Sequence, residues 1–256
     1  WVLKTLGRNH TPKDVLALID RAMGSGVTNI NVDIIFGVPS SLRRATVTNQ
    51  RSHTRRIEQE IEQIATLVKH VSCYLLTIEA GSHFFETGVK ERIREKEVEA
   101  IFKVMDKHGF EWYEISNFAL KGYKCRHNLK YWRLENTLGL GLGSVSFINS
   151  PKGAIRIFNT KDMKTYLNGK RTAFVETLSE LELSRERLIL GLRSHLGIDY
   201  AAFKDNPKVE TLISQGLLRL TSGKLYLTRN AFSQSNNVIS YLLATLEPRD
   251  SFTSFC

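Results

Sequence analysis

Three polar side chains lie where a mixed α/β chain would place a binding site. Asp33, Glu79 and Asn117 fall within or just after short apolar segments. Asp33 is the most informative of them, because it interrupts the apolar run 30–35 and burying an unpaired carboxylate is costly. This carboxylate therefore either faces a polar pocket or caps a nearby turn at the strand end, and the sequence leaves both interpretations open.

The three cysteines do not form a local metal site. Cys73, Cys125 and Cys256 are far apart in the sequence, so neither a CxxC nor a CxxxCxxC pattern exists. Thiolates for a structural zinc ion or an iron–sulfur cluster usually come from such close spacings. A sparse, odd set of cysteines also favours a reducing compartment over a disulfide framework, and we expect a cytoplasmic protein.

The glycine-rich run 139–144 carries only a weak signal for a phosphate site. No lysine follows its glycines, and its spacing does not match a dinucleotide-binding loop that opens a helix. We expect tight turns there, next to a strand at 145–148.

The net charge of +10 favours anionic partners such as nucleic acids, acidic membrane surfaces or anionic small molecules. Part of the excess is local, because five arginines gather within or next to a polar stretch, 40–54, that has no periodicity. No aromatic residue lies among them to stack on bases, so we expect a solvated loop rather than a nucleic-acid surface. No apolar run is long enough to span a bilayer. The five arginines are Arg43, Arg44, Arg51, Arg55 and Arg56.

The elements that would position these residues begin with a helix at residue 12. Thr11 suits the N-cap, Pro12 the first turn and Asp14 the place of a capping acid. Gly24 and Gly26 are expected to end this helix.

Helices and short apolar strands then alternate three times. Strands are expected at 28–36, 71–78 and 110–115, and helical periodicity appears around 57–68 and 98–105. This order predicts an α/β fold with a parallel sheet covered by helices, either a barrel segment or an open sheet. In both, ligands bind at the carboxyl ends of the strands.

A different module begins near residue 177. It contains a helix at 180–192, a short helix at 209–213, a hairpin over 217–227 and a last helix at 230–243. Helices followed by a two-stranded wing resemble a winged-helix unit, although that fold alone does not establish nucleic-acid binding.

Eight segments follow one another along the chain: LGRNHT (6–11), NVDIIFGVP (31–39), YLLTIEAG (74–81), YEISNF (113–118), HNLKYW (127–132), GLGLGSVS (139–146), RIFN (156–159) and LGLRSHLGI (190–198). Taken in this order, they resemble the oxygen-independent coproporphyrinogen-oxidase-like radical-SAM family. The HNxxYW segment, 127–132, points to the heme-chaperone branch of that family rather than to the true oxidase. The chain starts at Trp1 rather than at a methionine, and we expect it to be the C-terminal two-thirds of such a protein.

This resemblance implies the fold and the domain organisation. Residues 1–170 would be the C-terminal part of a partial radical-SAM (β/α) barrel that includes the HNxxYW region. Residues 177–246 would be a small winged-helix-like domain, and 247–256 a disordered tail. The cysteine motif that holds the family's 4Fe-4S cluster is absent from this sequence, so we expect the chain by itself to carry out no radical chemistry.

The resemblance also implies roles for particular residues. Arg8 and Asp33 would contact S-adenosylmethionine, because a guanidinium suits carboxylate or ribose oxygens and an aspartate suits sugar hydroxyls. His127 would be an axial ligand of heme iron, and Tyr131 and Trp132 would stack on the macrocycle. Asn128 belongs to the same segment and is included in the heme site.

Three functions follow from this interpretation. The favoured one is a heme chaperone that binds heme and passes it to an acceptor protein of unknown identity. The first alternative is an enzyme, an oxygen-independent coproporphyrinogen III oxidase that decarboxylates coproporphyrinogen III to protoporphyrinogen IX. The second alternative, a nucleic-acid binder that uses the basic loop and the winged module, is not favoured. The sequence indicates neither the acceptor nor the oligomeric state.

Overall fold

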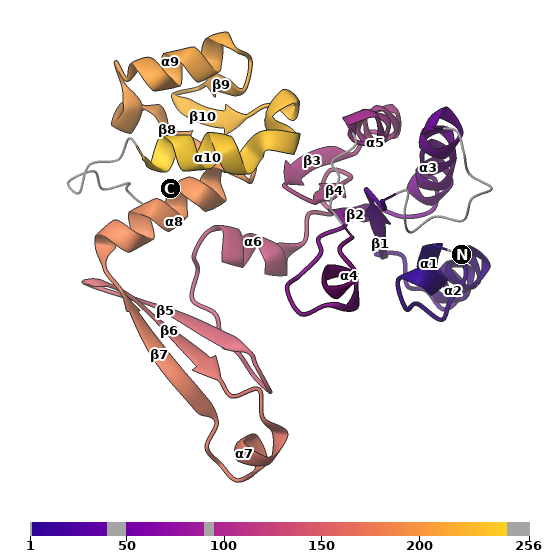
Figure 1. Ribbon diagram of the computed structural model, residues 1–256, viewed down its shortest axis with the longest axis horizontal. Helices are drawn as coiled ribbons and strands as arrows, with labels where there is room; N and C mark the ends of the chain where they lie inside the picture. Colours follow the sequence, from indigo (N-terminus) through magenta and orange to yellow (C-terminus); the bar gives the residue numbers. More distant parts are fainter. Residues whose placement is uncertain (1, 40–49, 90–94, 245–256) are drawn as a thin grey trace. The chain divides into compact units, whose positions relative to one another are not determined.

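The computed structural model describes residues 2–39, 50–89 and 95–244 of the chain (Figure 1). It consists of two compact units, Trp1–Lys124 and Cys125–Cys256. The HNxxYW segment therefore lies in the second unit, although it was expected to belong with residues 1–170. The assignment of 1–170 and 177–246 as folding domains stays a prediction, and the expected disordered tail lies outside the described residues.

The first unit is a small mixed sheet with helices, as expected for the α/β class. Its strands are ordered β1-β2-β4-β3, with β1 and β2 parallel over the whole of both strands. In chain order its elements are α1 (Val2–Thr5), α2 (Pro12–Gly24), β1 (Asn31–Phe36), α3 (Gln50–Ala65), β2 (His70–Leu75), α4 (His83–Glu86), α5 (Glu95–Lys107), β3 (Glu111–Glu114) and β4 (Asn117–Ala119).

The third predicted strand does not pair with the second. After β3 the chain turns within residues 115–116 and returns as β4, which pairs antiparallel with both β3 and β2. Because β4 takes the position next to β2, Asn117 is the first residue of an antiparallel strand and pairs with Ser72 inside the sheet, rather than lying at the carboxyl end of a parallel strand. The expectation of three adjacent parallel strands is therefore wrong at this edge, because a short turn favours an antiparallel return.

The predicted start of the helix at residue 12 and the loop predicted at 40–54 had different outcomes. The N-terminus of α2 is confirmed, because Asp14 N–H donates to Thr11 Oγ1 at 3.3 Å and Thr11 N–H donates to Asp14 Oδ2 at 2.8 Å. The loop expected at 40–54 is wrong for 50–54, since α3 begins at Gln50. Glutamine and arginine are good helix formers, and they extend the helix whose apolar face starts at Ile57. Residues 40–49, with Arg43 and Arg44, lie outside the described part of the chain.

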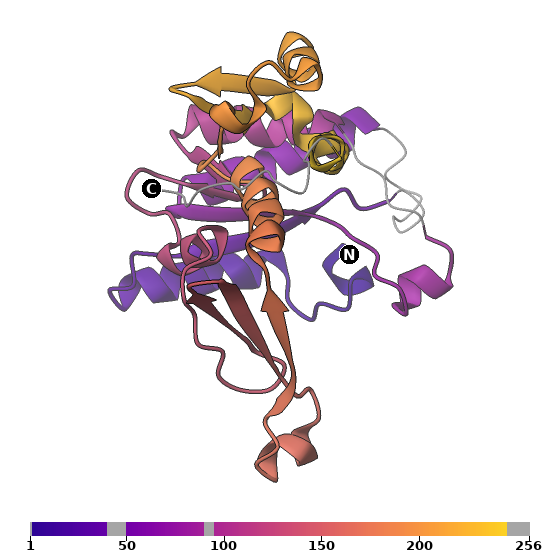
Figure 2. The ribbon, with the colours of Figure 1, turned by 90° about the vertical axis from the view of Figure 1, so that its left-hand side faces the viewer.

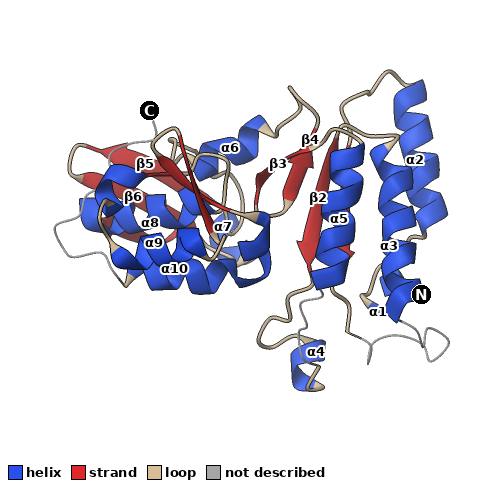
Figure 3. Ribbon diagram, turned by 90° about the horizontal axis from the view of Figure 1, so that it is seen from above, coloured by secondary structure: helices blue, strands red, loops and turns tan. Residues whose placement is uncertain are grey.

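Helices α3 and α5 pack against each other and cover the sheet (Figure 3). Ile61, Val104 and Met105 are fully buried there, and two lysines of α5 form ion pairs with glutamates of α3. The buried carboxylate of Glu97 on α5 accepts a hydrogen bond from Gly37 N–H at 3.0 Å, which fixes the loop after β1.

The second unit contains two three-stranded antiparallel sheets. One, β5-β6-β7, extends away from α8 and has α7 at its far end (Figure 2). The other, β8-β10-β9, packs with the last helices. The elements are α6 (Arg126–Trp132), β5 (Val145–Ser150), β6 (Gly153–Asn159), α7 (Met163–Leu167), β7 (Thr172–Leu178), α8 (Glu180–Leu192), β8 (Ile198–Asp199), η2 (Tyr200–Phe203), α9 (Pro207–Ser214), β9 (Leu218–Thr221), β10 (Lys224–Leu227), η3 (Arg229–Gln234) and α10 (Ser235–Leu243).

The C-terminal module agrees with its prediction except at its last helix. Leu188, Leu225 and Leu242 are fully buried where α8, the hairpin and α10 meet. The predicted helix at 230–243 is a 3₁₀ segment up to Gln234 and becomes α-helical only from Ser235. Among the described residues, no helix is both long and apolar enough to cross a bilayer.

Candidate functional site

Helix α6 carries two aromatic side chains of the HNxxYW segment on one face. His127 and Tyr131 are one helical turn apart, their ring centroids lie 5.0 Å apart, and the rings are nearly perpendicular, at 87°. Both residues are exposed. Asn128 and Trp132 form a second pair at the same spacing, about 100° further around the helix. A flat ligand on the first pair would therefore not meet the second pair face on, and the heme roles of Asn128 and Trp132 stay predictions.

A strained residue of the site, Leu134, follows the C-cap of α6. Leu134 has a φ of 52°, in the left-handed region where glycine is usual after a helix. Its N–H donates to Tyr131 O at 3.1 Å, and Glu135 N–H donates to Lys130 O at 2.9 Å, which together form a Schellman motif. A leucine in this conformation costs about 1 kcal/mol, and here its side chain packs on the core around Phe147.

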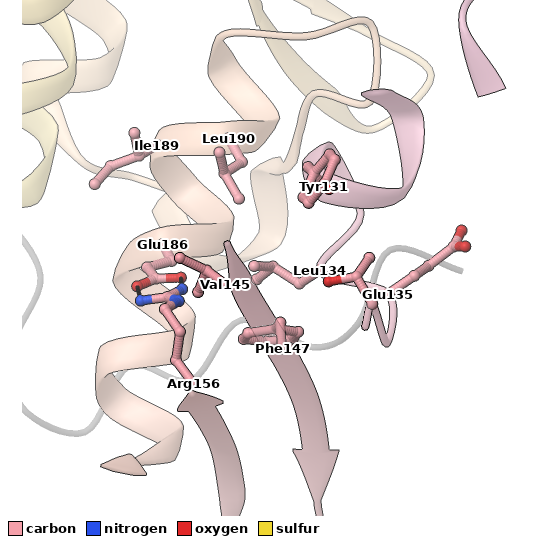
Figure 4. Close-up of a pocket in the computed structure, with 10 residues that line it drawn as sticks. Tyr131, Leu134, Glu135, Val145, Phe147, Arg156, Glu186, Ile189 and Leu190 are labelled. Carbon is pink, nitrogen blue, oxygen red and sulfur yellow. Dashed lines mark hydrogen bonds and ion pairs between the residues drawn. The ribbon is translucent and has the colours of Figure 1, made fainter. Parts of the chain in front are cut away.

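A pocket of about 370 Å³ lies next to this face of α6. Figure 4 shows its walls, which come from the end of α6, from β5, from β6 and from α8. Most of the lining is apolar, and the half-exposed ring of Tyr131 belongs to it. The buried Thr137 Oγ1 has no hydrogen-bond partner within the described residues. The lining residues are Tyr131, Leu134, Glu135, Thr137, Val145, Phe147, Arg156, Glu186, Ile189 and Leu190.

Arg156 forms the charged part of the pocket. Its guanidinium binds Glu186 through two hydrogen bonds of 3.1 and 2.8 Å, and it donates to Glu176 at 2.9 Å. The hydrogen bonds that the guanidinium donates to Glu186, and to a lesser extent the one to Glu176, raise the pKa of Arg156. The guanidinium also lies 5.4 Å from the centre of the Phe147 ring. The three charged groups tie β6 and β7 to α8 and leave a net negative charge.

Asn159, the last residue of the RxxN segment, holds the glycine-rich loop. Its amide donates to Gly141 O at 3.0 Å and to Ser144 Oγ at 2.9 Å. Gly139 allows close packing, since a Cβ there would lie 2.6 Å from the backbone of Val145. The expected turns next to a strand are confirmed, because β5 begins at Val145.

In the first unit, Asp33 belongs to a chain of hydrogen bonds that involves residues of three strands, β1, β2 and β3. Asn31 Nδ2 donates to Asp33 Oδ1 at 2.7 Å, and His70 Nδ1 lies 2.6 Å from Asn31 Oδ1. Since that amide oxygen can only accept, His70 carries its proton on Nδ1, and its Nε2 accepts from Tyr113 O–H at 2.7 Å. Burial lowers the pKa of His70, so the ring is neutral, and the chain fixes the Asp33 carboxylate on the exposed side of β1.

Arg8 and Glu79, the other charged candidates of the first unit, are both exposed. Arg8 follows α1, where its N–H donates to Leu3 O at 2.8 Å. Whether Arg8 and Asp33 share one ligand stays a prediction. Burial raises the pKa of the Cys73 thiol to about 12, so this thiol stays protonated. Of the arginine cluster, Arg56 forms an ion pair with Glu60 on the surface of α3.

A buried carboxyl group, not assigned a role from the sequence, lies where β3 turns into β4. Glu114 is 2% exposed, and burial raises its pKa to about 7. It accepts from Ser116 N–H at 3.0 Å and from the amide of Asn117. The Asn117 Oδ1 atom is buried without a partner within the described residues. The resemblance of 113–118 to the YEISNF segment was the signal that could have singled out this pair.

Comparisons with known proteins place the chain in a family. Residues 178–233 match the model of the HemN C-terminal domain. The heme chaperone HemW of Bacillus subtilis (strain 168) is 30% identical over 96% of this chain and 67% of its own length. The chain belongs to the HemW/HemN-like family.

Other members of the HemW/HemN-like family support this assignment. The heme chaperone HemW of Lactococcus lactis is 27% identical over 94% of this chain and 65% of its own length, and that of Mycobacterium tuberculosis (strain H37Rv) is 30% identical over 94% and 62%. The solved coproporphyrinogen III oxidase HemN of Escherichia coli, a radical SAM enzyme, shares the fold, with a TM-score of 0.67 at 15% identity. That match covers 93% of this chain and 60% of HemN. The chain thus spans about two thirds of the length of these relatives.

Proposed function

We propose that this chain binds heme and, as part of a heme chaperone, passes it to an acceptor protein. The observation that carries the proposal is the pairing of His127 with Tyr131 next to an apolar pocket. A neutral imidazole is a good axial ligand for heme iron, and an aromatic ring and apolar walls suit a flat macrocycle. The relatives named heme chaperone HemW support the same function. We propose a cytoplasmic location.

Replacing His127 with alanine tests this function. We expect heme added to the unchanged chain to give a red-shifted Soret band, and we expect the variant to lose that shift and at least about tenfold in affinity, because the iron would lose its axial ligand. The measurement is a heme titration followed by absorbance, with His83→Ala as the control, since His83 is an exposed histidine on α4. An unchanged spectrum in the His127 variant would contradict the proposal.

We further propose that Arg8 and Asp33 contact S-adenosylmethionine, as the kinship with a radical SAM enzyme implies. The residues fit the ligand: Arg8 presents a cation to solvent, and Asp33 presents a carboxylate that the Asn31 amide holds by one oxygen. When bound together with a cluster, this cofactor supplies radical chemistry, which the described residues do not supply by themselves.

Calorimetric titration with S-adenosylmethionine tests this second site. We expect Arg8→Ala and Asp33→Asn each to weaken binding by about tenfold, as is usual for the loss of a charge-assisted hydrogen bond. Lys4→Ala is the matched control, because Lys4 is an exposed cation on α1. Equal affinities for all three variants and the unchanged chain would remove Arg8 and Asp33 from the site, as would the absence of binding by the unchanged chain.

A further inference from the structure

We propose that the pocket next to His127 takes the vinyl-bearing edge of heme, while Arg126 and Lys130 on α6 hold its two propionates. This inference rests on the proposed binding of heme at His127 and adds the orientation of the porphyrin and the choice among porphyrins.

The shape of the pocket favours an edge rather than a whole ring. At about 370 Å³ it lies near the lower end of the range of roughly 300–1,000 Å³ for pockets that enclose small ligands. Heme is a large, flat ligand, so one edge can enter while the rest lies along α6. The walls that this edge would meet are apolar, from Leu134, Val145 and Phe147 on one side and Leu190 on the other. Methyl and vinyl groups are the apolar substituents of heme and suit these walls.

The strained Leu134 supports the use of this wall for binding. Glycine would adopt its left-handed conformation at lower cost, but would leave that side of the pocket without a side chain. Strained residues of this kind cluster at sites where a ligand is held.

The net negative charge of the pocket disfavours entry of the heme edge that carries the two propionates. Arg156 is the cation at its floor, and the carboxylates of Glu176 and Glu186 more than neutralise it. Glu135 also lines the pocket, but its carboxylate pairs with Arg133 at 3.5 Å and adds no net charge. A propionate that entered would lose its hydration and meet like charges, so the propionates must point out of the pocket.

Helix α6 carries two cationic side chains on the side where the propionate edge of heme would lie outside the pocket. Arg126 precedes His127 directly, and Lys130 lies one turn further along α6. At 100° per residue both point roughly 60–100° away from the His127 side chain, on one stripe of the helix. Both are exposed and can form ion pairs with carboxylates. A porphyrin bound by iron at His127 can thus place one edge in the pocket and the other on this stripe.

A comparison of three iron porphyrins tests the orientation in the unchanged chain. Iron protoporphyrin IX should bind most tightly, and its dimethyl ester about five- to tenfold more weakly, because its esters cannot pair with the two cations. Iron coproporphyrin III carries propionates in place of the vinyl groups and should bind about thirtyfold more weakly, because charged groups would have to enter the pocket. The Soret band, read for each porphyrin, reports whether His127 ligates the iron.

The double variant Arg126→Gln, Lys130→Gln gives the second arm of the test. It should weaken heme binding about five- to tenfold and leave the affinity for the dimethyl ester within about twofold. Lys164→Gln, Lys170→Gln removes the same charge from exposed positions of the same unit and should change neither affinity. Equal affinities for all three porphyrins, with a Soret band that still depends on His127, would overturn the orientation and leave heme binding intact. Loss of the His127 dependence with every porphyrin would overturn both.

Discussion

Replacing Gly153 with alanine should destabilise the second unit by more than about 3 kcal/mol, enough to unfold its β5-β6-β7 sheet. A Cβ built at Gly153 lies 1.9 Å from the carbonyl oxygen of Leu178, which is a backbone atom of the neighbouring strand. The φ of Gly153 is also 137°, in a region essentially reserved for glycine. The chain must therefore shift both strands to accept one methyl group, which is a mechanism of severe destabilisation.

Gly169→Ala is the matched control for this prediction. Gly169 also has a positive φ, of 85°, but no atom lies within 4 Å of its built Cβ. We expect a cost of only about 1–2 kcal/mol there, the cost of the left-handed conformation alone. Urea denaturation gives both free energies of unfolding. Equal costs for the two variants would show that the approach of Gly153 to Leu178 does not limit the fold.

The same substitution should reduce heme binding, because the sheet positions the pocket. Phe147 and Arg156 project from β5 and β6, and Arg156 holds Glu186 of α8. The Soret titration of the Gly153 variant should therefore show weaker binding than that of the Gly169 variant, although neither glycine lines the pocket.

Elements set by local signals could be predicted from the sequence. The capping pattern Thr11-Pro12-Lys13-Asp14 fixes the start of α2, and Ser222-Gly223 allows the tight turn of the hairpin between β9 and β10. In such elements the residues that decide the structure are neighbours in the chain, so their pattern is sufficient.

The sheet β5-β6-β7 could be predicted only in its first strand. Strand β7 has five exposed residues out of seven, so no apolar alternation marks it. Strand β6 does have β-branched residues at Ile155 and Ile157, but a glycine and basic residues around it obscure the signal. These strands form because they pair with one another and pack on α8, which are non-local interactions.

The candidate site also combines features that local sequence signals indicate with features that depend on non-local contacts. The resemblance singled out the segment 127–132 without placing it on a helix, and the pairing of the His127 and Tyr131 rings appears only in the structure, where α6 brings the two side chains to one face. The pocket next to them brings together residues 131 and 190, and no local pattern relates α6 to β5, β6 and α8. Likewise, the sequence identifies Asp33 as costly to bury, but its fixation through Asn31 and His70 depends on the register of β1 against β2.

Replacing Glu114 with glutamine should raise the free energy of unfolding by about 2–3 kcal/mol at pH 8. Burial raises the pKa of this carboxyl from an ordinary 4.5 to about 7. Above pH 7 the folded chain therefore buries a charged carboxylate, which costs free energy, whereas the unfolded chain leaves the same carboxylate in water. A shift of this size corresponds to roughly 3 kcal/mol. Glutamine keeps the shape of the side chain and the oxygen that accepts from Ser116 N–H. If the Asn117 amide rotates by 180°, the new amide at position 114 can also donate to Asn117 Oδ1, which has no partner among the described residues.

The pH dependence gives the sign of the effect. The folded state has the higher proton affinity at Glu114, so the destabilisation is complete above pH 7, fades as the pH falls through 7 and is absent below about 4.5, where both states are protonated. The advantage of the glutamine variant should therefore shrink to less than about 1 kcal/mol at pH 5. Glu99→Gln, at an exposed position on α5, should show no such change between pH 5 and pH 8. An advantage of equal size at both pH values would mean that Glu114 is ionised throughout, held by the amide of Asn117, and would contradict the raised pKa.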